Sequence, residues 1–209
     1  MRCAPLITTL LWYGACMAEN NIETKNALDS LARALKNIAK PTELCLKLDS
    51  VALSPIKKIS NTYGAALMLQ VDQNGLMRVS KIHSVKQLHV TIGYIQMTDQ
   101  EELKKALQIG KIILEQELKQ DLIPGKANYN FCTEKCEPKF GHITAFIPTK
   151  QTESLLKKLN LTLEKGLCNK GITLNPQTKS TSYTPHMTLA TSVLDNNTID
   201  MINKALENA

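Results

Sequence analysis

The sequence predicts an α+β fold, in which antiparallel strands build the core and helices pack on their outer faces. Two observations lead to this prediction. Apolar runs of strand length alternate with long helical patterns, in the order strands, helix, strands, helix, strand, helix. After the N-terminal segment, no break in composition and no flexible linker divides the 209-residue chain. That length suits one domain, or two small lobes that share a core.

The N-terminal segment differs from the rest. Residues 1–18 contain one charge, at Arg2, then an apolar stretch and the small-x-small site Cys16-Met17-Ala18. This pattern is typical of a secretory signal peptide, and a buried N-terminal helix is the alternative. We therefore expect an exported protein, periplasmic or secreted, or a cytoplasmic one if the segment is not cleaved.

Residues 19–60 are expected to form an N-terminal helical extension, and residues 61–209 the main domain. Apolar residues recur at helical spacing over 21–39, and Pro41 ends the pattern. Residues 44–53 alternate loosely, which predicts a strand or an edge segment.

Before its second helix, the main domain contains five strand-like runs: 64–71, 76–83, 86–95, 126–132 and 139–147. A turn at 72–75 separates the first two, and a loop with Cys132 and Cys136 joins the last two. The capping box Thr98-Asp99-Gln100-Glu101 opens a long helix. A second helix follows Pro148, and Asp195 or Asn197 caps a third after the polar loop 175–184.

Charge and cysteine content set broad limits. The formal net charge of +6 mildly favours anionic partners, although no block of like charge is present. Four cysteines remain after the leader, an even number that an oxidising compartment would allow to pair: Cys45, Cys132, Cys136 and Cys168. Their connectivity stays open. Buried or disulfide-bonded cysteines are favoured over a zinc site, because no second Cys/His pair has matching spacing.

Two strand-like stretches carry the same polar pattern. In the first, His89, Thr91 and Gly93 share one face, while Leu88, Val90, Ile92 and Tyr94 share the other. In the second, which follows Pro185, His186 and Thr188 share one face and Met187 and Leu189 the other. Two strands that each present a His and a Thr to one space would form a phosphate site with an acid and a base.

These stretches, "LHVTIGYI" and "PHMTLA", resemble the paired His-x-Thr motifs of the two-histidine phosphoesterase superfamily. Its members include the LigT-like RNA ligases, the cyclic phosphodiesterases and the A-kinase-anchor-like phosphoesterases. The resemblance covers residues 63–209. It implies a bilobal, pseudo-symmetric fold with a central cleft between antiparallel sheets.

The resemblance also implies a metal-independent phosphodiesterase without a cofactor. Its substrates would be 2′,3′-cyclic phosphates or 2′-5′ linked nucleotides, in RNA or as small nucleotides. His89 and His186 would act as the catalytic acid and base, in an order that stays open, while Thr91 and Thr188 would bind phosphate. We expect a monomer without a membrane span.

A third His-x-Thr, His142-Ile143-Thr144, also lies in a strand-like run. We expect a structural or rim role for His142, and a surface or hairpin position for His83. One alternative function is a metal hydrolase in which His89, His142 and His186 are three ligands.

A second alternative is a non-catalytic module that binds RNA or another partner. Four aromatic residues could stack on a base or simply fill the core: Tyr94, Phe140, Phe146 and Tyr183. Tyr183, in the loop before the second motif, is the expected base-stacking residue.

Overall fold

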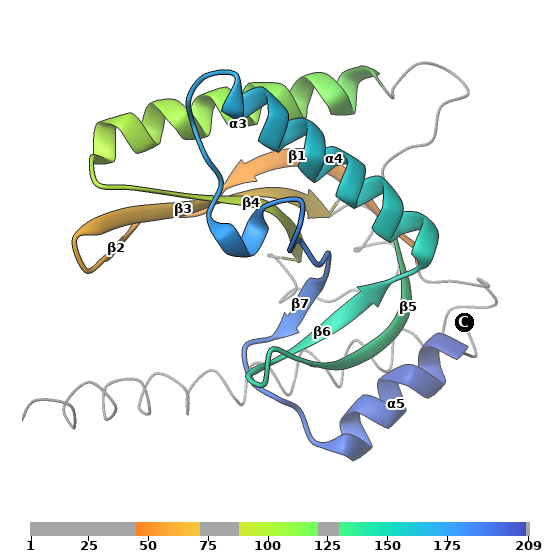
Figure 1. Cartoon of the computed structure of the whole chain (residues 1–209). Coiled ribbons are helices and arrows are strands. Elements are labelled where there is room, and N and C mark those ends of the chain that lie inside the picture. The colour runs from red at the N-terminus through yellow and green to blue at the C-terminus, as the bar shows by residue number, and fades with distance from the viewer. Residues whose placement is uncertain (1–44, 72–87, 121–129, 208–209) are drawn as a thin grey trace, which may run out of the picture.

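The computed structural model describes residues 45–71, 88–120 and 130–207 (Figure 1). The predicted leader over 1–18, the helix over 21–39, the strand over 76–83 and His83 lie outside these ranges. The described elements are β1 (Cys45–Leu53), β2 (Lys57–Ile59), β3 (Thr62–Val71), β4 (His89–Met97), α3 (Gln100–Gln120), β5 (Asn130–Lys139), β6 (Ile143–Pro148), α4 (Lys150–Cys168), the 3-10 helix η1 (Pro176–Thr178), β7 (Met187–Ala190) and α5 (Asn196–Glu207).

The strands form one seven-stranded sheet in which every pairing is antiparallel. Its order is β1-β5-β6-β7-β4-β3-β2, and β1 also pairs with β3. Six strands therefore follow one another in a closed circuit, with β2 added beside β3. The prediction of an α+β fold built on antiparallel strands is confirmed.

Strands β1 and β2 correct the predicted helical extension over residues 19–60. Leu48 and Val51 of β1 are buried in the core, and β1 pairs along β3. The alternating pattern over 44–53 did indicate this strand. Residues 45–53 and 57–59 are consequently strands of the sheet and not part of a helical extension.

A disulfide joins the ends of β1 and β5. Cys45 and Cys132 face each other in the β1–β5 pairing and are bonded across 87 residues of sequence. The other two described cysteines are free, Cys136 buried and Cys168 exposed. Burial raises the pKa of the Cys136 thiol to about 12, helped by the negative charge of Glu137.

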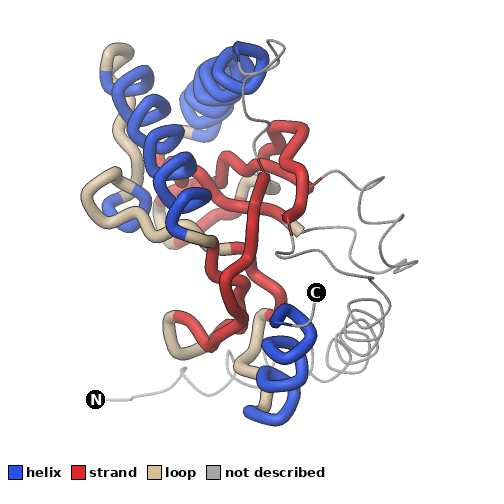
Figure 2. Tube along the Cα trace, turned by 90° about the vertical axis from the view of Figure 1, so that its right-hand side faces the viewer, coloured by secondary structure: helices blue, strands red, loops and turns tan. Residues whose placement is uncertain are grey.

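Helices α3 and α4 lie together over one face of the sheet (Figures 1 and 2). Their leucines supply the buried stripe, and full burial of each such side chain contributes about 1.5–3 kcal/mol: Leu103, Leu107, Leu114, Leu156, Leu159, Leu163 and Leu167. Gly110 lets α3 approach β3 closely, because a Cβ there would come within 2.7 Å of Leu67 Cδ1. Within the described ranges, no helix is long and apolar enough to span a membrane.

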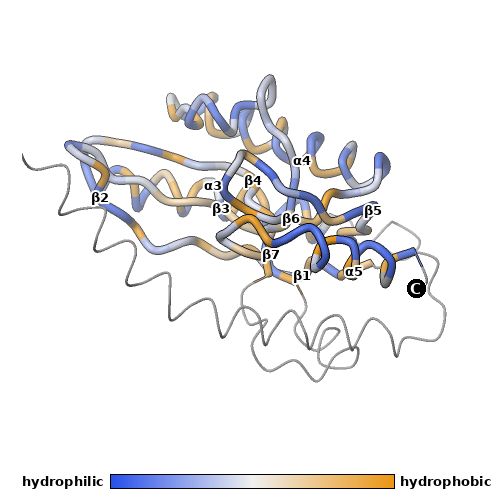
Figure 3. Tube along the Cα trace, turned by 90° about the horizontal axis from the view of Figure 1, so that it is seen from below, coloured by the Kyte–Doolittle hydropathy of each residue, from blue (hydrophilic) through white to orange (hydrophobic). Residues whose placement is uncertain are grey.

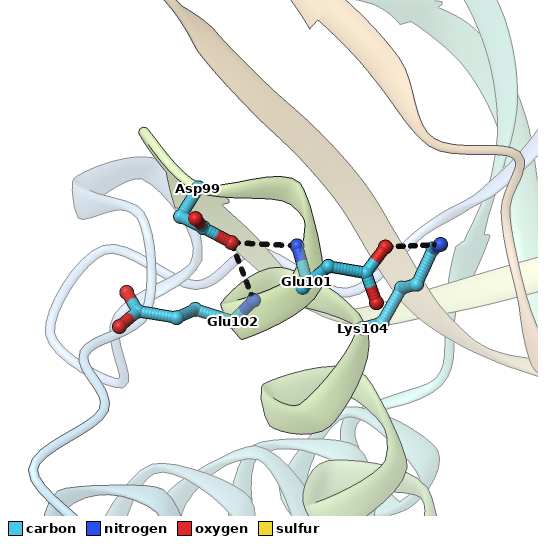
Figure 4. Close-up of polar contacts among 4 residues, drawn as sticks. All are labelled: Asp99, Glu101, Glu102 and Lys104. Carbon is cyan, nitrogen blue, oxygen red and sulfur yellow. Dashed lines mark hydrogen bonds and ion pairs between the residues drawn. The ribbon is translucent and has the colours of Figure 1, made fainter.

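The first turn of α3 is capped by Asp99, one residue later than the predicted Thr98 (Figure 4). Its Oδ1 accepts hydrogen bonds from the backbone N–H groups of Glu101 at 2.7 Å and Glu102 at 2.9 Å. A carboxylate is favoured here because it also complements the positive end of the helix dipole. Asp195 caps α5 in the same way, because its side chain accepts a hydrogen bond from the Thr198 N–H at 3.0 Å. Of the two predicted caps, Asp195 and Asn197, the first is therefore the observed one.

Helix α5 covers the part of the β5 edge that β1 does not reach. Asn203 acts there as a strand would: its Oδ1 accepts from the Cys136 N–H at 2.7 Å, and its Nδ2 donates to the Cys136 carbonyl at 2.9 Å. Ile202 and Leu206 are buried beside it, while Figure 3 shows hydrophilic residues along much of the helix. The free strand edge is thereby satisfied and protected.

Candidate active site

The strands of the two motifs are neighbours in the sheet. Val90 of β4 pairs with Met187 of β7, and both side chains are completely buried in the core on the helix side. Alternation along a strand sends the residues before and after each of them to the opposite face. That face therefore receives all four predicted site residues, each of them half-buried: His89, Thr91, His186 and Thr188.

The antiparallel register also sets which of these residues face each other. Continuing the Val90–Met187 pairing by one residue in each direction places His89 opposite Thr188 and Thr91 opposite His186. The positive charge of His89 is also close enough to contribute to the lowered pKa of His186. The structure thus brings the two motifs together as a reciprocal arrangement of two imidazoles and two hydroxyls.

A β-bulge changes the predicted neighbours of this group. Leu67 of β3 pairs with Gly93, whereas Met68 pairs with Thr91, so β4 contains one extra residue. Gly93 consequently faces α4, where a Cβ would lie 2.8 Å from Leu163 Cδ2. The prediction that Gly93 shares the face of His89 and Thr91 is wrong, and Tyr94 points to that face instead.

The hydroxyls distinguish the two motifs from the third His-x-Thr. Thr144 is completely buried; its Oγ1 donates to the Ser192 carbonyl at 3.0 Å and accepts from the Leu194 N–H at 2.9 Å. Among the residues that the structure describes, neither the Thr91 hydroxyl nor the Thr188 hydroxyl has a hydrogen-bond partner. These two hydroxyls are available to a ligand, whereas that of Thr144 holds the loop before α5.

His186 is held in one tautomer by its own loop. Its Nδ1 lies 2.9 Å from the Thr184 carbonyl oxygen, which can only accept, so the Nδ1–H donates and Nε2 carries the free lone pair of the neutral ring. Burial lowers the pKa of His186 below its ordinary value of 6.5. The Thr184 contact opposes this shift, while the charges of Lys139 and His89 add to it. Neutral His186 is therefore a proton acceptor at Nε2.

The loop 172–186 takes the place of a neighbouring strand along β4 beyond Val90. The Asn175 N–H donates to the Tyr94 carbonyl at 2.8 Å, and the Tyr94 N–H donates to Thr178 Oγ1 at 2.9 Å. The Tyr183 hydroxyl donates to the Thr91 carbonyl at 2.8 Å. Because the backbone of β4 is satisfied by this loop, the position of the loop and that of Thr91 are linked.

Two residues of α4 anchor the same loop, and neither was predicted. Asn160 is completely buried, and its Nδ2 donates to the carbonyls of Ile92 at 2.7 Å and Thr178 at 2.9 Å. One turn later, Glu164 Oε2 accepts from the Ser180 N–H at 2.9 Å, and the Ser180 contacts lower the pKa of its carboxyl. The sequence did contain one signal for Asn160, since it is a polar residue within the leucine stripe of α4.

Tyr183 does not have the predicted base-stacking role. Its side chain is only 6% exposed and belongs to the hydrophobic core, and burial raises the pKa of its hydroxyl. Because the ring packs inside and the hydroxyl is bonded to Thr91, neither face of the ring can receive a base. Its observed role is to tie the loop before His186 to β4.

The segment around His142 also differs from the prediction. Cys132 and Cys136 lie within β5 itself, and the chain reverses at Phe140, Gly141 and His142. His142 is thus an exposed turn residue, and its Nδ1 lies 2.8 Å from the Phe140 carbonyl. Within the described ranges, no three His, Cys, Asp or Glu side chains gather closely enough to hold a metal ion.

The turn between β5 and β6 contacts the site through Phe140. The ring centroids of Phe140 and His186 lie 5.2 Å apart, in an edge-to-face arrangement with an interplanar angle of 73°. Lys139 Nζ lies 5.7 Å from the Phe140 centroid. The face of the sheet that carries the two motifs is therefore bordered by an exposed aromatic ring and a cation.

Together these groups can accept a proton, donate a proton and hydrogen-bond the oxygens of a phosphate, all on one face of the sheet. His186 is oriented by Thr184, and the loop that carries it is anchored by α4 and β4. No protein-family model, curated protein or solved structure matches the chain.

Proposed function

We propose that the protein is a metal-independent phosphodiesterase that hydrolyses 2′,3′-cyclic phosphates or 2′-5′ linked nucleotides, in RNA or as small molecules. The observation that supports this proposal most is the reciprocal placement of the two His-x-Thr motifs on neighbouring antiparallel strands. If the Val90–Met187 register continues by one residue on each side, each imidazole lies opposite a hydroxyl from the other motif. Such an arrangement provides an acid and a base on either side of one phosphate.

His186 acts as the base in hydrolysis. Its neutral Nε2 accepts a proton from water as the water oxygen bonds to phosphorus. The bond from phosphorus to the 2′ or 3′ oxygen breaks, and protonated His89 donates its proton to that oxygen. The product is a phosphate monoester with a free hydroxyl, and the two histidines have exchanged protonation states. This assignment rests on the Nδ1–Thr184 contact of His186, with support from its lowered pKa.

Thr91 and Thr188 bind the two non-bridging oxygens of the phosphate. Both residues are half-buried, and their hydroxyls have no hydrogen-bond partner among residues 45–71, 88–120 and 130–207. A partly desolvated hydroxyl gains more from a charged phosphate oxygen than an exposed one does. Lys139, whose charge reaches His186, adds attraction for the anion.

The same proposal includes the two-lobed arrangement that the family resemblance implies. One motif lies on β4, which follows β3, and the other on β7, which pairs with β6. Each lobe would then contribute one His and one Thr at the seam where β4 meets β7. The reciprocal register at this seam supports an approximate two-fold relation between the lobes.

We also propose export. The Cys45–Cys132 disulfide suits an oxidising compartment, where such bonds persist. The leader-like residues 1–18 agree with this location.

The test is turnover of a panel of 2′,3′-cyclic nucleotides and 2′-5′ linked dinucleotides by the protein from Glu19 onward, with EDTA present throughout. We expect a phosphate monoester product at an unchanged rate in the chelator, because imidazoles and hydroxyls need no cation. Loss of activity in EDTA that zinc or manganese restores would favour the three-histidine metal hydrolase. Binding of these nucleotides without turnover would favour the non-catalytic module.

A further inference from the structure

Phe140 occupies a backbone conformation that suits a different residue. Its φ is +53°, and Gly141 after it has a φ of +72°. Left-handed conformations at two successive turn positions favour Asn, Asp or Gly, and a bulky side chain there is strained. The turn would accordingly be more stable with Asn at position 140, so the geometry of the turn does not explain why an aromatic residue is present there.

The ring of Phe140 also gains little from burial. It is 59% exposed, more than the other exposed large hydrophobic side chains in the described ranges. Phe131 and Phe146, by contrast, are completely buried in the core. Strain without compensating burial is typical of residues that have a functional role.

The position of the ring indicates what it could contact. Its ring centroid lies 5.2 Å from that of His186, and Lys139 Nζ lies 5.7 Å from its centroid. A molecule whose phosphate lies between the two histidines would therefore extend its next group toward Phe140. In a nucleotide, that group carries a flat aromatic base.

We propose that Phe140 is the base-stacking residue of this site, and that it selects nucleoside phosphates over phosphates without a base. This inference rests on the proposed function for the position of the phosphate. Base–aromatic stacking tolerates any of the bases, because each has a π-face. The site would thus prefer nucleotides as a class, without strong choice among bases.

The test compares two cyclic phosphates that differ in the base: adenosine 2′,3′-cyclic phosphate and ribose 2,3-cyclic phosphate. The variants are Phe140→Asn, Phe140→Trp and the control Ile112→Ala, which removes another exposed apolar side chain, 52% exposed, from α3 on the helix side. Phe140→Asn should lower kcat/KM for the adenosine substrate by at least about fivefold, the low end of base–aromatic stacking. It should leave the ribose substrate unchanged, and Phe140→Trp should retain the preference for adenosine.

The melting temperature separates recognition from folding. Phe140→Asn should melt at the same temperature as the parent or higher, because Asn tolerates the left-handed turn. Equal losses on both substrates would overturn the inference, since Phe140 would then act only by packing against His186. No loss on either substrate would overturn it as well.

Failure of the proposed function has a different signature. If the parent turns over neither substrate, binding of adenosine 3′-monophosphate is measured by calorimetry. Binding that Phe140→Asn weakens and Ile112→Ala does not would retain the stacking role on a non-catalytic module. Absence of binding by the parent would overturn both proposals.

Discussion

Replacing Asn160 by Ala tests how the loop before His186 is held. The change removes two hydrogen bonds, to the carbonyls of Ile92 and Thr178, from a completely buried position. An unpaired buried carbonyl costs about 1–3 kcal/mol, and the partly buried second one about 0.5–1.5 kcal/mol. Loss of Asn160 Oδ1, which has no partner within the described ranges, offsets a little of this. We expect a net loss of about 2–4 kcal/mol of unfolding free energy.

Urea unfolding at constant pH measures this loss as a lower midpoint at an unchanged slope. For a chain of this size the melting temperature should fall by about 2–4 °C per kcal/mol. Asn197→Ala is the control, because Asn197 is exposed on α5 and the exchange there reports mainly helix propensity. If Asn160→Ala is within about 0.5 kcal/mol of Asn197→Ala, the two hydrogen bonds do not hold the loop and the reasoning is refuted.

Three further outcomes follow from the site and its surroundings. Tyr183→Phe removes only the hydroxyl that donates to the Thr91 carbonyl, so it should cost about 1 kcal/mol in urea unfolding; no change would show that this bond contributes nothing. The base must be neutral, and the pKa of His186 lies below 6.5, so kcat/KM should persist as the pH falls through 6.5 and decline only below it. Lys139→Gln removes one of the charges that lower this pKa, so the decline should move to higher pH. A decline at lower pH in this variant would contradict the assigned electrostatics. Alkylation of the folded, non-reduced protein from Glu19 onward should modify Cys168 alone. Cys45 and Cys132 are bonded to each other, and Cys136 is buried with a raised pKa. Reaction of Cys45 or Cys132 would argue against the disulfide and against export.

The sequence was sufficient for the elements whose pattern is local. The leucines of α3 and α4 recur at helical spacing, so both helices were predicted, and most of their inward residues are buried as expected. The motif strands were predicted from alternation, and both contribute their His and Thr to one face. Even so, the observed cap of α3 is Asp99 and not the predicted Thr98, because both residue types are good caps and the sequence does not choose between them.

Features that depend on pairing between distant segments were not predictable. The bulge that moves Gly93 and Tyr94 arises only when β4 pairs with β3, and alternation in one strand cannot reveal it. The partner of Cys45 lies 87 residues away, and nothing in the spacing selects Cys132 over Cys136. Tyr183 was predicted to be exposed because its loop is polar. In the structure its hydroxyl donates to the Thr91 carbonyl of β4, and its ring is buried in the core.

The third His-x-Thr shows the same limit in the site. By sequence, His142 and Thr144 match the other two motifs. The sequence already favoured a structural or rim role for His142, and the fold adds two reasons: it commits the Thr144 hydroxyl to the loop before α5 and places His142 in a turn. A short motif therefore gives the residue types, and pairing in the sheet shows which copies lie on neighbouring strands.

The most direct test of the two-histidine site is kcat/KM for a 2′,3′-cyclic nucleotide in four folded variants, each checked by a cooperative melt. His89→Ala and His186→Ala should each lose about 10²–10⁴-fold, the range for general acid–base groups. The double variant should lose less than the product of the two, because the histidines act as a unit. His142→Ala should lose less than about tenfold. Near-normal turnover by His186→Ala, or a folded His142→Ala as inactive as His89→Ala, would contradict the pairing of His89 with His186.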